Sequence, residues 1–90
     1  RWEERRAKRW VEAVAAEVRA ERKATGRTPA SVDHLLGKVG RPPRFVSRTA
    51  ACGYSAGPRG FGFDVDDPTA FLAGGWTYDG ETGAWKYWVD

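Results

Sequence analysis

GGWTYDGETGAWKYW, residues 74–88, places five aromatic side chains on the two sides of one short polar turn. Aromatic residues flanking a turn are typical of paired strands, because they pack well on a pleated surface. The DGETG residues at 79–83 are typical turn formers, and Gly83 is suited to a positive φ. This stretch therefore predicts a β-hairpin that closes the fold.

The aromatic residues of this hairpin divide between its two faces, because side chains alternate along a strand. Cross-strand aromatic pairs stabilise hairpins, but exposed Trp and Tyr on a sheet can also stack against a sugar or a nucleobase. We expect a structural role first, in which Trp85 packs in the core. The candidate partner surface consists of Trp76, Tyr78, Tyr87 and Trp88.

Two further strands are predicted upstream of this hairpin. FVSRTAACGYSAG (45–57) and GFGFDV (60–65) are separated by a Pro-Arg-Gly turn, and the second run alternates Phe and Val with Gly and Asp. These runs predict a second hairpin and an antiparallel sheet of about four strands. Phe71 and Leu72, in the connection to the last hairpin, are expected in the core.

The first 24 residues predict a long amphipathic helix. Residues 2–24 contain no Gly or Pro and are rich in Ala, Glu and Arg, all favourable to helix. One apolar stripe recurs with the helical period, and Thr25-Gly26 then ends the helix. The stripe consists of Ala7, Val11, Val14 and Val18, flanked by Trp10 and Ala15.

The length of this helix predicts an overhang. A helix of about 23 residues spans roughly 35 Å, whereas a domain of this size has a radius of gyration of about 12 Å. We expect the N-terminal end to protrude, because the apolar stripe starts only at Ala7. Trp2, nearly opposite that stripe, suits an interface, a membrane headgroup layer or simply a frayed end.

Residues 26–44 predict a turn, a short second helix and an extended connection. Thr28 is suited to the N-cap, with Pro29 at the first helical position, and Gly37 is expected to end the helix after a pair of leucines that would face the core. RPPRF (41–45) must be extended, because each Pro disfavours helix at the residue before it. The whole chain predicts one α+β domain over 1–90: a protruding helix at 1–25, a short helix and loop at 26–44, and a sheet at 45–90.

Charge is uneven along the chain, whose net charge is +3. The first 27 residues hold nine basic and five acidic side chains, so the basic excess belongs to the helix. A basic helix is compatible with nucleic acid or an anionic membrane surface, and it is equally the ordinary solvated face of a surface helix.

Residues able to perform chemistry are few, and we expect no enzymatic activity, no cofactor and no metal. Cys52 is the only cysteine and His34 the only histidine, so neither has a ligand or catalytic partner of the same kind at a useful spacing. Asp64, Asp66 and Asp67 lack the regular spacing of a calcium loop. Solvated loop carboxylates are the simpler interpretation, and a cation site there stays open.

Three features resemble the periplasmic part of type IV pilin-like proteins, including the pseudopilins of type II secretion. The long helix begins the chain abruptly, ATGRTPASVDHLLG (24–37) resembles the segment that follows such a helix, and GGWTYDGETGAWKYW resembles the closing hairpin. The likeness covers about two thirds of the chain. The aspartates do not match the calcium loop of major pseudopilins, and no Cys pair closes the C-terminal loop, so a minor or divergent pilin fits better.

This resemblance implies a structural subunit of a type IV pilus-like or type II secretion filament, acting by assembly and partner contact. Its partners would be other pilin-like subunits. Before assembly, an apolar segment upstream of Arg1 would anchor the protein in the bacterial inner membrane, with residues 1–90 in the periplasm or outside the cell. The face expected to meet neighbouring subunits consists of Trp2, Arg5, Arg9, Ala13, Ala16 and Ala20. The three alanines are small enough for close approach, although Ala is also the best helix former.

A rival hypothesis is a small basic ligand-binding module. It would use exposed Trp, Tyr and Arg side chains to hold nucleic acid or glycan. Because the basic residues belong to the helix and the aromatic residues to the sheet, we expect them on different sides of the molecule, which argues against nucleic acid.

Overall fold

A computed structural model describes residues 2–44, 46, 53–67 and 73–89. It contains a long helix α1 (Trp2–Thr25), a 3-10 turn η1 (Asp33–Leu35) and a short helix α2 (Leu36–Val39). Four strands follow: β1 (Tyr54–Gly57), β2 (Gly60–Asp66), β3 (Gly74–Asp79) and β4 (Trp85–Val89). The predicted α+β fold, with a long helix, a short helix and a four-stranded antiparallel sheet, is confirmed.

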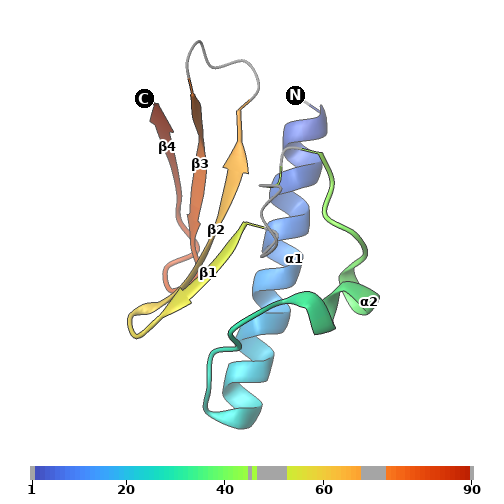
Figure 1. The fold of residues 1–90 in the computed structure, drawn as a ribbon, viewed down its shortest axis with the longest axis vertical. Helices are drawn as coiled ribbons and strands as arrows, with labels where there is room; N and C mark the ends of the chain where they lie inside the picture. The colour runs from blue at the N-terminus through green and yellow to red at the C-terminus, as the bar shows by residue number, and fades with distance from the viewer. Residues whose placement is uncertain (1, 45, 47–52, 68–72, 90) are drawn as a thin grey trace.

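The sheet is a simple meander in which each strand pairs antiparallel with the next one along the chain. α1 lies across one face of this sheet, and α2 lies against α1 on the side away from the sheet (Figure 1). The molecule therefore has two layers, and the sheet has one face that no described element covers.

The core lies between α1 and the inner face of the sheet. Every member of the predicted apolar stripe of α1 is buried, and so are the alternating residues Phe61, Phe63 and Val65 of β2. The edge of the Trp10 ring meets the Phe63 ring at 6.2 Å. Burial of one Val or Phe side chain contributes about 1.5–3 kcal/mol to folding, so this one seam holds helix and sheet together.

The prediction that α1 protrudes at its N-terminal end is wrong. α1 begins level with the end of β4, and its C-terminal end extends past the β1–β2 hairpin (Figure 1). The stripe ends at Val18, and the seven residues that complete the helix, RAERKAT, contain no large aliphatic side chain. The sheet therefore leaves the C-terminal turns uncovered, while Ala7 near the other end is fully buried.

The second helical segment begins later than predicted. Thr28 and Pro29 precede it, and helical structure runs from Asp33 to Val39. Gly37, the predicted end, lies inside α2, and Gly40 with φ of 84° ends the helix instead. Pro29 is buried in the connection, and its carbonyl accepts a hydrogen bond from the Tyr54 hydroxyl at 2.6 Å. A contact with a residue 25 positions away thus overrides the local signal for a helix start.

The upstream hairpin is confirmed within the described residues. β1 and β2 pair from Tyr54 opposite Phe63 to Gly57 opposite Gly60, across the Pro58-Arg59 turn. Val46 forms an isolated bridge with Val65. Most of the predicted strand before Gly53, including Cys52, lies outside the described residues, as do Phe71 and Leu72.

Candidate interaction surfaces

The aromatic residues of the closing hairpin form two cross-strand pairs. Tyr78 pairs with Trp85 at 4.9 Å between ring centroids, and Trp76 pairs with Tyr87 at 5.1 Å. Both pairs lie on the face of the hairpin that α1 covers, because Tyr78 is buried in the core and Trp76 and Trp85 pack against it. The predicted pairing of aromatic residues in a hairpin is therefore present, and it faces the helix.

Charged side chains on one side of α1 contact the aromatic residues of this face. The Lys8 ammonium lies 4.5 Å from the centre of the Trp76 ring, and Glu12 accepts a hydrogen bond of 3.1 Å from the Trp85 indole. Arg19 donates to the Tyr78 hydroxyl at 2.6 Å and to the Gly80 carbonyl at 3.2 Å. These side chains are four and seven positions apart along α1, about one and two helical turns, so they line up over the hairpin.

The four residues of the predicted partner surface do not form one surface. Tyr78 is only 4% exposed, so its place in an exposed surface is wrong, and Trp76 is half-buried beneath Lys8. Tyr87 is 45% exposed on the inner face and Trp88 is 37% exposed on the outer face. Alternation along the strands predicted which residues share a face, but it did not show which face α1 covers.

The exposed face of the sheet, called the outer sheet face below, carries charged and small residues. Asp64 of β2 lies beside Thr77 of β3, whose hydroxyl donates to it at 3.1 Å. The face is flattest at Gly75, where the Trp88 ring lies 3.3 Å from the place that a methyl group would take. By strand alternation and register the face consists of Ser55, Gly62, Asp64, Asp66, Gly75, Thr77, Asp79, Lys86 and Trp88.

The exposed face of α1, called the outer helix face below, includes all six residues predicted to meet neighbouring subunits. Trp2 is 68% exposed, with the Arg6 guanidinium 5.1 Å from its ring centre. The helical period also places Arg6, Lys23 and Ala24 on this face, and a helical-wheel projection of the sequence would have included them. The exposed members are Trp2, Arg5, Arg6, Arg9, Ala13, Ala16, Ala20, Lys23 and Ala24.

The histidine and the aspartates form no candidate chemical centre. His34 contacts Glu21 at 2.5 Å and so ties η1 to α1. Asp64 and Asp66 point to the outer sheet face, whereas Asp67 accepts a hydrogen bond of 2.6 Å from Tyr87 on the inner side. Among the described residues, no three His, Cys, Asp or Glu side chains converge as a metal site would require.

Two tyrosines are held in their neutral form. Burial, with help from the nearby Glu21 carboxylate, raises the pKa of Tyr54 above its ordinary value of 10.0. The hydrogen bond from Tyr87 to Asp67 raises the pKa of Tyr87 in the same direction. Both hydroxyls act as donors that hold segments together.

A shallow cavity of about 510 Å³ lies beyond the end of α1, lined by Glu21, Thr25 and residues 27–30. Its walls come from the last turns of α1 and the connection that follows, and all of them except the buried Pro29 are at least partly exposed, so it has the character of a surface depression. None of the helices in the described part of the chain is both long and apolar enough to cross a membrane.

Comparison with known proteins finds no match to this chain among protein-family models, curated proteins or solved structures.

Proposed function

We propose that this protein is a structural subunit of a type IV pilus-like or type II secretion filament, as a minor or divergent pilin. It acts by assembly and partner contact. The observation that carries the proposal is the outer helix face: a helix of 24 residues is covered by the sheet on one side and by the η1–α2 segment on another, and leaves the outer helix face exposed. A helix that serves only as a lid on a small sheet does not need an exposed Trp or a continuous row of alanines there.

The fold supports the same proposal. The resemblance implied a long N-terminal helix packed on an antiparallel sheet, with a short helical segment between them, and the protein has that arrangement (Figure 1). This agreement concerns architecture, and many functions share an architecture. The proposal therefore depends on the exposed helix face, which a filament subunit would use and a simple α+β domain would not.

The proposal includes a location. The protein would be held at the bacterial inner membrane by an apolar segment upstream of Arg1, with residues 1–90 in the periplasm or outside the cell. The reading frame upstream of Arg1 tests this directly. A run of about 20 apolar residues, as spanning requires, with a Glu near its start supports a pilin-like protein, and an initiator Met just before Arg1 contradicts it.

Assembly itself is tested by photo-crosslinking in the cells that produce the protein. A photoreactive phenylalanine at position 16 lies on the outer helix face, and the same group at position 30 lies in an exposed bend between α1 and η1. We expect a ladder of crosslinked copies from position 16 and mainly monomer from position 30. Monomer from both positions, in cells where the protein is abundant, contradicts assembly through α1.

The rival hypothesis of a stacking module loses support from the hairpin. Four of its five aromatic residues face α1, and the Lys8 ammonium lies over two of them. A base or sugar would have to displace Lys8 and the helix to stack on Trp76, Tyr78 or Trp85, which leaves the exposed Tyr87 as the accessible ring of this face. Trp88 offers one ring on the outer sheet face, and that face carries three aspartates, which disfavours an anionic nucleic acid strand.

A further inference from the structure

The two outer faces of this protein carry opposite charge. The outer helix face exposes the bases Arg5, Arg6, Arg9 and Lys23, and the acids at its two edges, Glu12 and Glu17, are bound to Trp85 and Lys38. The outer sheet face exposes the acids Asp64, Asp66 and Asp79 against one base, Lys86. A chain with a modest net charge of +3 has therefore separated its charges between its two sides.

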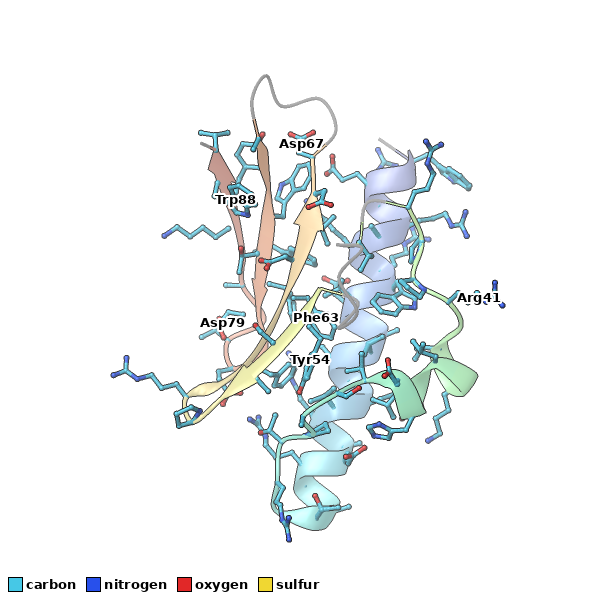
Figure 2. The ribbon with its side chains drawn as sticks, in the orientation of Figure 1. Arg41, Tyr54, Phe63, Asp67, Asp79 and Trp88 are labelled. Atoms are coloured by element: carbon cyan, nitrogen blue, oxygen red, sulfur yellow. The ribbon has the colours of Figure 1, made fainter. Side chains whose placement is uncertain are left out.

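These faces belong to different elements and point in different directions. The sheet covers one side of α1 and the η1–α2 segment packs on another, so the outer helix face is the side that neither covers. The uncovered face of the sheet looks away from α1 (Figure 1). Figure 2 shows Trp88 and Asp79 on the β3–β4 side of the molecule, away from α1. Contact between the basic face of one copy and the acidic face of another would leave one free face of each kind.

We propose that copies of this protein associate head to tail, with the outer sheet face of one copy docked on the outer helix face of the next. This inference rests on the proposed function and deepens it, because it names the two surfaces that meet and identifies the occupant of each as a second copy of the chain.

Charge complementarity favours this pairing over a symmetric dimer. Two outer helix faces would bring four bases against four bases, and two outer sheet faces would bring aspartates together. Like charges placed in contact suppress a wrong pairing. The head-to-tail contact is the one arrangement of these two faces that opposes unlike charges, and a heterologous contact can repeat without closing on itself.

The shapes of the faces also suit one another. The alanines at 13, 16 and 20 leave a low, smooth strip along α1 between the basic residues. Gly62 leaves part of the sheet equally low, and the Trp88 ring lies against the buried Gly75. An aromatic ring against small side chains supplies apolar contact, while aspartates on one face and arginines on the other set the register.

A charge-swap experiment on the purified chain tests the pairing. The first variant, Arg5→Glu with Arg9→Glu, makes the helix face acidic, and the second, Asp64→Lys with Asp66→Lys, makes the sheet face basic. Self-association is measured by sedimentation at increasing concentration in low salt. We expect each variant alone to associate at least tenfold more weakly than wild type, and an equimolar mixture of the two to recover association.

A matched control keeps the result specific. Arg27→Glu with Arg41→Glu changes the net charge as much as the first variant, but at exposed positions outside both faces. It should associate like wild type, and circular dichroism should show all three variants folded. Raising the salt concentration to 0.5 M, where screening shortens the reach of charge to about 4 Å, should weaken the wild-type contact.

The crosslinking and charge-swap experiments together distinguish failure of the head-to-tail pairing from failure of the proposed function. If position 16 crosslinks copies in cells while the charge-swap mixture shows no recovery, assembly through α1 stands and the head-to-tail pairing is wrong. If position 16 gives no crosslinked copies, both are wrong. If the wild-type chain stays monomeric but binds single-stranded DNA or anionic vesicles, and Arg5→Glu with Arg9→Glu abolishes that binding, the basic face serves an anion and the pairing is overturned.

Discussion

The buried phenol of Tyr54 links the connection after α1 to the first strand. Its hydroxyl donates to the Pro29 carbonyl, and burial raises its pKa above 10.0 in the folded state. A raised folded pKa means that the stability from the neutral phenol is complete below about pH 10 and is lost as the pH rises through the folded pKa. The unfolded chain ionises first, so alkaline pH favours unfolding.

Tyr54→Phe should therefore lose about 1 kcal/mol of stability at pH 8, where the hydrogen bond is missing, and should show a smaller further loss between pH 9 and 11. Urea unfolding at several pH values measures both quantities. Tyr87→Phe is the comparison, because Tyr87 is exposed and should leave most of the alkaline loss in place. An alkaline loss in Tyr54→Phe equal to that of wild type would contradict this assignment.

Gly75 is required by a close approach of two strands. A methyl group there would lie 2.3 Å from the Val65 carbonyl oxygen of β2 and 3.3 Å from the Trp88 ring. Gly75→Ala should cost about 2 kcal/mol, because backbone cannot move away as a side chain can. Gly57→Ala, where a methyl group meets no atom within 4 Å, should change the melting temperature little, and equal effects of the two substitutions would refute this explanation.

At the scale of elements, Trp85 and Trp88 lie close together in β4 but on opposite faces. Trp85 packs on Tyr78, donates to Glu12 and contacts the core, whereas Trp88 covers only Gly75. Trp85→Ala should destabilise the fold by about 2–3 kcal/mol, less than the 3–5 typical of fully buried aromatic residues. Trp88→Ala should cost under about 1 kcal/mol, and thermal denaturation of both variants decides whether the hairpin aromatics are structural.

Much of the fold could be predicted from periodicity alone. The stripe of α1, the alternation in β2 and the turn chemistry of both hairpins are local signals, and local signals agreed with the final fold. The start of the second helical segment could not be predicted, because Pro29 is held by Tyr54 from a strand 25 residues later.

The surfaces were harder to predict than the elements. Tyr78 is buried because α1 covers that face of the hairpin, with Arg19 reaching its hydroxyl, and no pattern within the hairpin reports which face a distant helix chooses. The outer helix face was more accessible to prediction, because the face opposite a buried stripe follows from the stripe itself.

At the scale of the whole molecule, α1 is held unevenly along its length. Beyond the core stripe, its C-terminal half is tied by Arg22 to Glu81 at 2.6 Å and by Glu21 to His34. Its first turn exposes Trp2 and the arginines that follow. Exposed pairs are individually weak, but these two act together on the C-terminal half, whereas the described contacts of the first turn are the Glu4–Lys8 ion pair and the Arg6–Trp2 contact within the helix itself.

Amide hydrogen exchange should therefore be faster near the start of α1 than near residues 18–22, by tenfold or more, because local opening follows the number of buried and bonded contacts. Mass spectrometry of peptides from the two ends measures the ratio. Equal protection would mean that the N-terminal turns are held by contacts beyond those described.

The exposed tryptophans give each outer face its own optical label. Trp2 lies among arginines and Trp88 on the face that carries Asp64, Asp66 and Asp79, while the other three indoles are buried or half-buried. Iodide, an anion, should collide preferentially with Trp2, and caesium, a cation, with Trp88, because each ion concentrates near the opposite charge. Fluorescence quenching by the two salts can thus report separately when either side of the molecule becomes covered, without any dye or engineered residue.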